Sequence, residues 1–370
     1  MSRMRASLSV AAMFLGGTAL ADAPNVAVDI APVHSLVARV MEGVGTPDLI
    51  LPSGASPHEH SLRPSEAAAL QEADLVVWMG PDLTPWMADA VDTLAEGADV
   101  ATLLEADGTV LLDIREGALF EAHDHDHDHD HDHDHDHDHD QGEGDHDHGE
   151  EHGHDDHTEA DGHDHDHGDQ AEAEHDHGDH AEAAAHEDDH DRDAHDDHGH
   201  GAHDPHAWLS PTNAAVWVDL IAAELSAADP DNAEAYGANA AAARAELDAL
   251  AGEVGAILAP VRGGRFIAFH DAYQYFELDF DLPASGAISL SDAADPSPAR
   301  IAEIQARVRD EGIGCVLAEP QFNPGLVETV LDGTEAKTGV IDPLGVTLEP
   351  GPALYPQLIR DMATTLAACL

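Results

Sequence analysis

The chain has 370 residues, which is enough for two domains of ordinary size. It carries 76 acidic against 14 basic residues, for a formal net charge of −62. Such a surface repels nucleic acid and anionic lipid and attracts cations, so we expect no nucleic-acid partner.

The first residues are typical of a secretory signal peptide over 1–21. Arg3 and Arg5 precede a short apolar run, and small residues stand at Ala19 and Ala21. We expect cleavage after Ala21 and a soluble periplasmic protein, because no lipobox cysteine is present. The alternative is a membrane anchor, but the apolar run is much shorter than the ~20 residues that span a bilayer.

The first half of the mature chain alternates strands with helices. The predicted strands are 25–30, 48–52, 75–80 and 98–104, and the predicted helices are 31–42, 63–74 and 85–97. Such alternation favours a mostly parallel sheet flanked by helices. We therefore assign 22–228 to an N-terminal α/β lobe.

A segment of very different composition interrupts this lobe between residues 121 and 204. It holds 26 of the 31 histidines and about 35 acidic residues, and it contains the repeat "HDHDHDHDHDHDHDHDHD". With so few apolar residues it cannot bury enough surface to order itself. We expect a disordered, metal-binding loop.

The rest of the chain predicts a long helix and a second lobe. Residues 229–260 are rich in helix formers and would reach ~40 Å at 1.5 Å per residue, as a spacer between two lobes. A second alternation over 261–370 predicts a C-terminal α/β lobe. The predicted strands are 265–271, 286–291, 315–320 and 338–345, and the predicted helices begin near 272 and cover 297–312, 324–334 and 354–370.

Two cysteines, Cys315 and Cys369, are present. An even pair in an exported protein suggests a disulfide, and the final helix would bring Cys369 back to Cys315. Two unpaired buried thiols are the alternative.

Outside the acidic segment only five histidines remain: His34, His58, His60, His206 and His270. His58 lies in a loop after a predicted strand, His206 stands just before a helix, and His270 ends a strand. Ligands of open α/β sheets gather at the carboxyl ends of strands, where Asp342 also lies. Three imidazoles and one carboxylate would form a tetrahedral Zn²⁺ site. His34, on a helix, is better interpreted as structural or as a surface residue.

Five stretches occur in order along the chain: "PHEHSLRPSE", "DPHAWLSP", "AFHDAYQYF", "AEPQF" and "IDPLG". They resemble the successive signatures of the cluster A-I metal-binding proteins of ABC importers, and most of all their zinc-uptake branch. The resemblance runs from about residue 25 to the C-terminus. It implies two lobes around a metal-binding cleft, and it places the family's ligands on His58, His206, His270 and Asp342.

The fourth ligand is the least settled position in this resemblance. Asp342 is the expected ligand, with water, Glu59 or, less favoured, His60 as alternatives. His60 stands where an aromatic residue is more usual. We interpret it as a solvent-facing substitution, and a residue that relays metal into the cleft is the alternative.

Imidazole suits Zn²⁺, whereas Mn²⁺ favours oxygen-rich sites, so we expect zinc rather than manganese. Affinity alone would also admit Cu²⁺, Ni²⁺ or Co²⁺. The acidic loop, including His123, His125, His127, His129 and His131, offers weaker sites, because ordering it costs roughly 1–2 kcal/mol per residue. We expect it to be an accessory that raises local zinc.

The resemblance implies capture of Zn²⁺ in the periplasm by a monomer and delivery to an inner-membrane ABC permease with its cytoplasmic ATPase. It leaves room for a periplasmic zinc chaperone. The alternative is a zinc buffer, storage or surface adhesion protein that acts mainly through the loop. We expect no enzymatic role, since the sequence lacks an HExxH helix, a GxSxG elbow and a P-loop.

Overall fold

The computed structural model describes residues 23–115, 117, 120, 203–289 and 296–370. The signal peptide expected over 1–21 and the histidines His123 to His131 lie outside the described residues. In the described part of the chain, no helix combines the length and apolar character needed to cross a membrane.

The N-terminal lobe contains a four-stranded parallel sheet in the order β2-β1-β3-β4. Its strands and helices agree with the predicted alternation of the sequence, with shorter strands. The strands are β1 (Val26–Val28), β2 (Asp48–Leu49), β3 (Leu75–Trp78) and β4 (Asp99–Thr102), and the helices are α1 (Ala31–Val40), α2 (Pro64–Gln71), α3 (Pro85–Leu94) and α4 (Pro211–Ala228).

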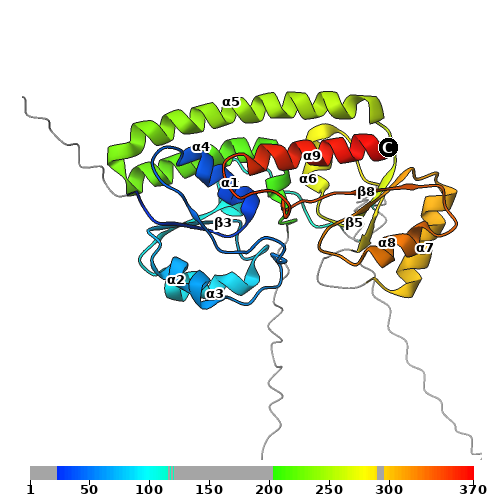
Figure 1. Cartoon of the computed structure of the whole chain (residues 1–370), viewed down its shortest axis with the longest axis horizontal. Coiled ribbons are helices and arrows are strands. Elements are labelled where there is room, and N and C mark those ends of the chain that lie inside the picture. The colour runs from blue at the N-terminus through cyan, green and yellow to red at the C-terminus, as the bar shows by residue number, and fades with distance from the viewer. Residues whose placement is uncertain (1–22, 116, 118–119, 121–202, 290–295) are drawn as a thin grey trace, which may run out of the picture. The chain divides into compact units, whose positions relative to one another are not determined.

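Successive side chains of β1 and β3 point to opposite faces, so both faces of this sheet are apolar. Val26 and Val28 belong to one core, which also contains residues of α1 and α4. Ala27 belongs to a second core, formed with residues of α2 and α3. Figure 1 shows α1 and α4 on one side of β3, and α2 and α3 on the other.

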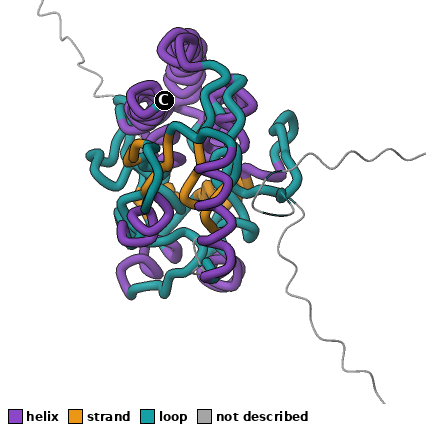
Figure 2. Tube along the Cα trace, turned by 90° about the vertical axis from the view of Figure 1, so that its right-hand side faces the viewer, coloured by secondary structure: helices purple, strands orange, loops and turns teal. Residues whose placement is uncertain are grey.

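The C-terminal lobe repeats this architecture with a second parallel sheet in the order β6-β5-β7-β8. Here too the strands lie inside and the helices outside (Figure 2). The strands are β5 (Phe266–His270), β6 (Ala287–Ser289), β7 (Cys315–Ala318) and β8 (Lys337–Val340), and the helices are α6 (Gln274–Phe280), α7 (Pro298–Asp310), α8 (Pro324–Leu331) and α9 (Leu354–Cys369).

In each sheet the chain leaves the first strand toward one edge and returns to the other edge. The order of strands therefore reverses between β1 and β3 in the first sheet, and between β5 and β7 in the second. Ligands of open α/β sheets bind at such switch points, beyond the carboxyl ends of the strands. His270 is the last residue of β5, and Glu319 follows β7 directly. The second switch point therefore carries an imidazole and a carboxylate side chain.

The long helix α5 (Ala233–Leu258) is bounded by 3₁₀ turns at 230–232 and 259–261. It is more than a spacer, because it packs against α4, α1 and α9. Its buried face repeats every three or four residues, as in an amphipathic helix that lies on a core. That face consists of Tyr236, Ala240, Ala243, Leu247, Leu250, Val254 and Leu258. One continuous hydrophobic core therefore includes residues of both lobes and of α5.

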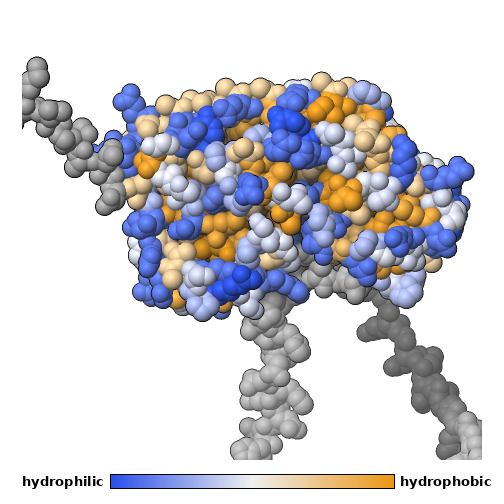
Figure 3. All heavy atoms as spheres, in the orientation of Figure 1, coloured by the Kyte–Doolittle hydropathy of each residue, from blue (hydrophilic) through white to orange (hydrophobic). Residues whose placement is uncertain are grey.

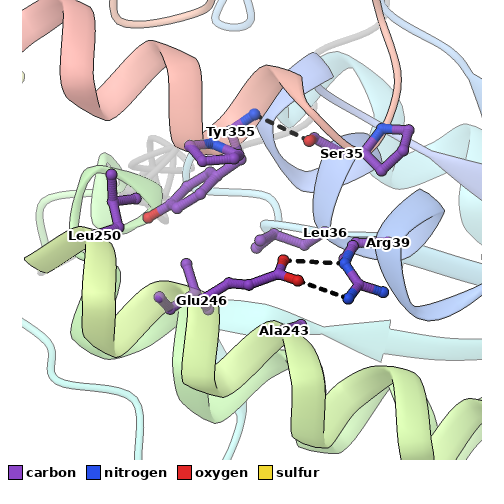
Figure 4. Close-up of a pocket in the computed structure, with 10 residues that line it drawn as sticks. Ser35, Leu36, Arg39, Ala243, Glu246, Leu250 and Tyr355 are labelled. Atoms are coloured by element: carbon purple, nitrogen blue, oxygen red, sulfur yellow. Dashed lines mark hydrogen bonds and ion pairs between the residues drawn. The ribbon is translucent and has the colours of Figure 1, made fainter.

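Polar contacts add to this packing at the point where α1, α5 and α9 meet (Figure 4). Arg39 donates two hydrogen bonds to the Glu246 carboxylate, at 3.0 and 2.8 Å. The backbone N–H of Tyr355 donates to the Ser35 hydroxyl at 2.9 Å. Helices that are distant in the sequence are thereby held at defined positions on α5.

The disulfide between Cys315 and Cys369 is confirmed, with Cα atoms 5.5 Å apart. It joins β7 to the last turn of α9 across 54 residues. In the chain-entropy model, closing a loop of that length stabilises the folded state by about 4 kcal/mol.

The face of the molecule seen in Figure 3 carries hydrophilic side chains across its whole extent, with hydrophobic groups between them. Most of the large apolar side chains lie inside.

Candidate metal centre

Three of the histidines singled out by the sequence come together from three separate segments. His58 lies in the loop between β2 and α2, His206 directly precedes a 3₁₀ turn that leads into α4, and His270 ends β5. The His58 and His206 rings are 5.4 Å apart between centroids, and the His206 and His270 rings are 5.3 Å apart. His206 is therefore the central member of the cluster.

The Nε2 atoms of His58 and His206 are 3.4 Å apart. This is long for a hydrogen bond between two nitrogens. Two nitrogens that each bind one Zn²⁺ at 2.0–2.1 Å with tetrahedral geometry would lie about 3.3 Å apart. The spacing of the two Nε2 atoms thus suits a shared metal ion better than a direct hydrogen bond.

Two buried carboxylates orient the imidazoles. Nδ1 of His206 lies 2.6 Å from Oδ1 of Asp204, and Nδ1 of His270 lies 2.7 Å from Oε1 of Glu319. A carboxylate accepts a hydrogen bond from Nδ1–H, which favours the neutral tautomer whose lone pair is on Nε2, the form that binds a metal. Both histidines and both carboxylates are buried. These contacts therefore favour, in both rings, the tautomer that a metal ligand needs.

Burial also changes the protonation of the surrounding acids. Burial raises the pKa of Asp204 to about 7, although the backbone N–H of His206 and the charge of Arg115 act in the opposite direction. Burial likewise raises the pKa of Asp271, next to His270, to about 6 against the opposing effect of Arg115. A cation in this region would stabilise the ionised carboxylates.

Arg115 is the cation that already neutralises part of this region. Its guanidinium donates to Asp271 with Nε at 3.1 Å, and to Glu277 with Nη1 at 2.9 Å and Nη2 at 3.0 Å. The Phe120 ring centroid lies 3.7 Å from its Cζ. Arg115 thus joins the segment after β4 to the C-terminal lobe, one residue from His270.

Asp342, the expected fourth ligand, lies after β8 and is half-buried. Its Oδ1 accepts hydrogen bonds from the backbone N–H groups of Leu344 and Gly345, at 3.2 and 2.9 Å. Its neighbour Pro343 accepts a hydrogen bond from Trp208, whose ring packs against His206. A carboxylate has about four acceptor positions, so these contacts leave Asp342 able to bind a metal.

Glu59 and His60, the other two residues considered as the fourth ligand, differ in their surroundings. Glu59 is exposed. The interpretation of His60 as solvent-facing is wrong, because its side chain is only 9% exposed and its Nε2 lies 2.9 Å from the Glu66 carboxylate. Its ring also packs edge-on against Trp86, which donates a hydrogen bond to the Pro57 carbonyl at 2.7 Å. The His58 loop folds back onto α2 and α3, and His60 helps to hold it there.

His34 is buried on α1, where its Nε2 lies 3.0 Å from the Pro47 carbonyl oxygen. Burial lowers its pKa and favours the neutral ring. This agrees with the structural role expected from its position on a helix.

The sequence analysis assigned no role to Asp204 or Glu319. Both stand inside the motifs "DPHAWLSP" and "AEPQF", so the signal was their closeness to the expected ligands. In the described residues, no three His, Cys, Asp or Glu side chains are already arranged to hold a metal ion. His58 and His206 have the spacing of ligands, and His270 adjoins them, so a metal held by all three needs a local adjustment.

We expect Glu319→Gln to weaken zinc binding about 10- to 100-fold, the usual effect of losing a carboxylate partner of a ligating histidine. The amide is a poorer acceptor and no longer fixes the tautomer of His270. Competition with a chelator of known affinity measures the change. The exposed Glu328 on α8 gives a matched control, since Glu328→Gln should leave affinity unchanged. Equal affinities of the two variants would contradict an orienting role for Glu319.

The fold and the histidine cluster define a class, the two-lobed solute-binding proteins. Comparison with known proteins narrows the class to a family. The family model described as zinc-uptake complex component A periplasmic, ZnuA, matches residues 26–369. The chain therefore belongs to the ZnuA family of periplasmic components of zinc uptake.

The high-affinity zinc uptake system protein ZnuA of Brucella abortus (strain 2308) is 44% identical over 357 residues, covering 96% of this chain and 95% of that protein. A solved structure described as the crystal structure of ZnuA superposes with a TM-score of 0.65 at 20% identity, over 94% of this chain and 99% of that one. FpvC of Pseudomonas aeruginosa, solved in complex with Mn²⁺, gives 0.64 at 16% identity, over 94% and 98%. These two structures support the fold.

Proposed function

We propose that this protein captures Zn²⁺ with high affinity in the periplasm and delivers it to an ABC permease in the inner membrane, which a cytoplasmic ATPase drives. The observation that carries the proposal is the pair of Nε2 atoms 3.4 Å apart on His58 and His206, beside the carboxylate-oriented His270. Membership of the zinc-uptake family supports the same role. The role is binding and transfer rather than catalysis, and the protein acts as a monomer.

Zinc is the proposed cargo because the candidate ligands are mainly nitrogen atoms. Imidazole suits Zn²⁺, while Mn²⁺ favours oxygen ligands. A structural relative that binds Mn²⁺ shares the fold at only 16% identity, which bears on the architecture and leaves the choice of metal to the ligands.

The fourth ligand in this proposal is Asp342. It lies after β8, one residue from Pro343, which accepts the hydrogen bond from Trp208 beside His206. Water is the alternative oxygen ligand. Glu59 is exposed and His60 is held by Glu66, so neither is the proposed ligand.

We further propose that the loop over 121–204 collects zinc weakly and raises its local concentration. Its alternating His and Asp residues offer interchangeable ligands with no fixed geometry. Micromolar binding in the loop against nanomolar binding at the histidines is a gap of about 4 kcal/mol.

The first test is a zinc titration of the metal-free protein against a chelator of known affinity. A variant that lacks Asp124 to Gly201 is titrated in parallel, with and without His58→Ala, His206→Ala and His270→Ala. The two flanks of the loop are joined by an antiparallel bridge between Asp113 and His203, so we expect the deletion to be tolerated.

One tight site should survive removal of the loop and should vanish when the three histidines are also changed. The loop would then account for extra weak equivalents in the full chain. If tight binding disappears with the loop alone, the transport proposal fails. The protein would then be a zinc buffer, storage or adhesion protein that acts mainly through the loop.

A further inference from the structure

The loop that carries His58 has no regular secondary structure of its own. His270 ends β5 and His206 precedes a 3₁₀ turn, whereas His58 lies between β2 and α2, where residues 50–63 form neither strand nor helix. A ligand on a loop keeps its position only if other side chains hold the loop in place. The residues on either side of His58 make such contacts.

His60, two residues after His58, is fixed between α2 and α3. Its Nε2 lies 2.9 Å from Oε2 of Glu66, the third residue of α2, and its ring packs edge-on against Trp86 at the start of α3. The side chains of His60 and Glu66 are each only 9% exposed. Two buried groups that hydrogen-bond each other are costly to separate, because each loses its partner without fully regaining water.

Glu66 is in turn held as a charged acceptor. Its Oε2 also accepts a hydrogen bond from the backbone N–H of Arg63 at 2.7 Å, where α2 begins. Although burial opposes its charge, the hydrogen bonds from Arg63 and His60 lower the pKa of Glu66. The acceptor for His60 is therefore an ionised carboxylate fixed on a helix.

A second anchor stands on the other side of His58. The Trp86 indole donates a hydrogen bond to the Pro57 carbonyl oxygen at 2.7 Å. Trp86 thus contacts the loop twice, through Pro57 before the ligand and through His60 after it. The backbone of His58 is held between these contacts, while its Nε2 lies 3.4 Å from that of His206.

We propose that His60 is a positioning residue, which together with Glu66 holds the His58 loop in the conformation that binds zinc. This inference rests on the proposed function, because it assumes that His58 is a zinc ligand. His60 acts through the loop rather than as a ligand, since Glu66 engages its Nε2. Without this anchor the loop would have to be ordered at the moment of binding, and the cost of ordering would reduce the affinity.

The test is a set of substitutions at His60 in the full chain, measured by chelator competition at less than one equivalent of zinc. His60→Ala removes both the hydrogen bond and the ring contact, and we expect the tight site to weaken about 10-fold. His60→Gln keeps an N–H donor at a comparable distance along the side chain, so its affinity should stay within about threefold of the parent protein. Because an amide is not among the usual zinc ligands, this rescue separates a positioning role from direct binding.

Glu66→Ala tests the other half of the pair. It should weaken zinc binding about as much as His60→Ala does. The double variant should lose little more than either single variant, because both changes break the same contact. Losses that multiply would show that the two residues act independently, and they would overturn the pairing.

His34→Ala is the matched control for the loss of a buried histidine from the same lobe. His34 is 5% exposed and its Nε2 lies 3.0 Å from the Pro47 carbonyl oxygen, but it lies on α1 rather than in the loop. We expect both His34→Ala and His60→Ala to lower the Tm of the metal-free protein. Only His60→Ala should also weaken zinc binding, so the control separates positioning from a general loss of stability.

The inference is overturned if His60→Ala keeps zinc affinity within about twofold of the parent protein. It is equally overturned if His60→Gln loses as much affinity as His60→Ala, or if His34→Ala weakens binding to the same extent. Failure of the proposed function looks different. In that case the parent protein itself would lack a tight site that depends on His58, His206 and His270.

Discussion

Replacing His206 by alanine in the full chain is expected to weaken the tight zinc site at least about 1,000-fold, or about 4 kcal/mol. His206 is central, since its ring adjoins those of both His58 and His270. Its loss removes one nitrogen ligand and leaves the buried carboxylate of Asp204 without its imidazole partner. Chelator competition at less than one equivalent of zinc measures the tight site before the loop begins to fill.

His203 supplies the control for this experiment. It lies three residues away, its side chain is 42% exposed, and its Nδ1 lies 3.1 Å from the Asp113 carboxylate. His203→Ala removes a histidine near the same place without touching the cluster, and it should leave the tight site unchanged. A loss in His203→Ala as large as that in His206→Ala would mean that the cluster is not the tight site.

Replacing Arg115 by alanine is expected to lower the free energy of unfolding of the metal-free protein by about 3–5 kcal/mol. The guanidinium is 18% exposed and bridges Asp271 and Glu277, which are 8% and 6% exposed. Although burial opposes its charge, the carboxylates of Glu277 and Asp271 raise the pKa of Arg115 above its ordinary value. Without Arg115 two buried carboxylates would share one site with no cation. Urea denaturation measures the loss.

Arg244 gives the matched control, because it pairs with Asp219 at 2.8 Å but both side chains are about half exposed, at 54% and 50%. Exposed pairs contribute about 0–1 kcal/mol, so Arg244→Ala should have little effect. Arg115→Lys should fall between the two, since an ammonium group cannot match the two-sided hydrogen bonding of a guanidinium. If Arg115→Ala cost no more than Arg244→Ala, the cluster of carboxylates would have another source of neutralisation.

The sequence predicted the α/β architecture because apolar strands and amphipathic helices follow periodicities that a single chain displays. The strand at Leu75–Trp78 and the helix at Leu354–Cys369 lie where the apolar pattern placed them. The disulfide could be predicted equally well, because the chain has only two cysteines and the last helix could bring them together. The histidines of the candidate site could be predicted because only five histidines lie outside the acidic segment.

The surroundings of those histidines could not be predicted from the sequence. His60, which stands where an aromatic residue is more usual, was interpreted as solvent-facing, but the loop folds onto α2 and α3, where Glu66 and Trp86 contact it. No local pattern reports such contacts, because Trp86 comes from a separate helix. Likewise the long helix α5 was interpreted as a spacer, although its buried face adjoins three other helices.

The sequence by itself determined the two α/β lobes and the disulfide partners, and it predicted the three histidines of the candidate site, since composition, periodicity and motif spacing are local properties of the chain. Only the tertiary structure decided which groups surround the histidines. Asp204 and Glu319 orient the rings, and Arg115 neutralises the acids beside them. The reason is that burial and hydrogen-bond geometry depend on segments that meet only when the chain folds. Burial and hydrogen bonding in turn set the protonation of the carboxylates and the orientation of the imidazole rings.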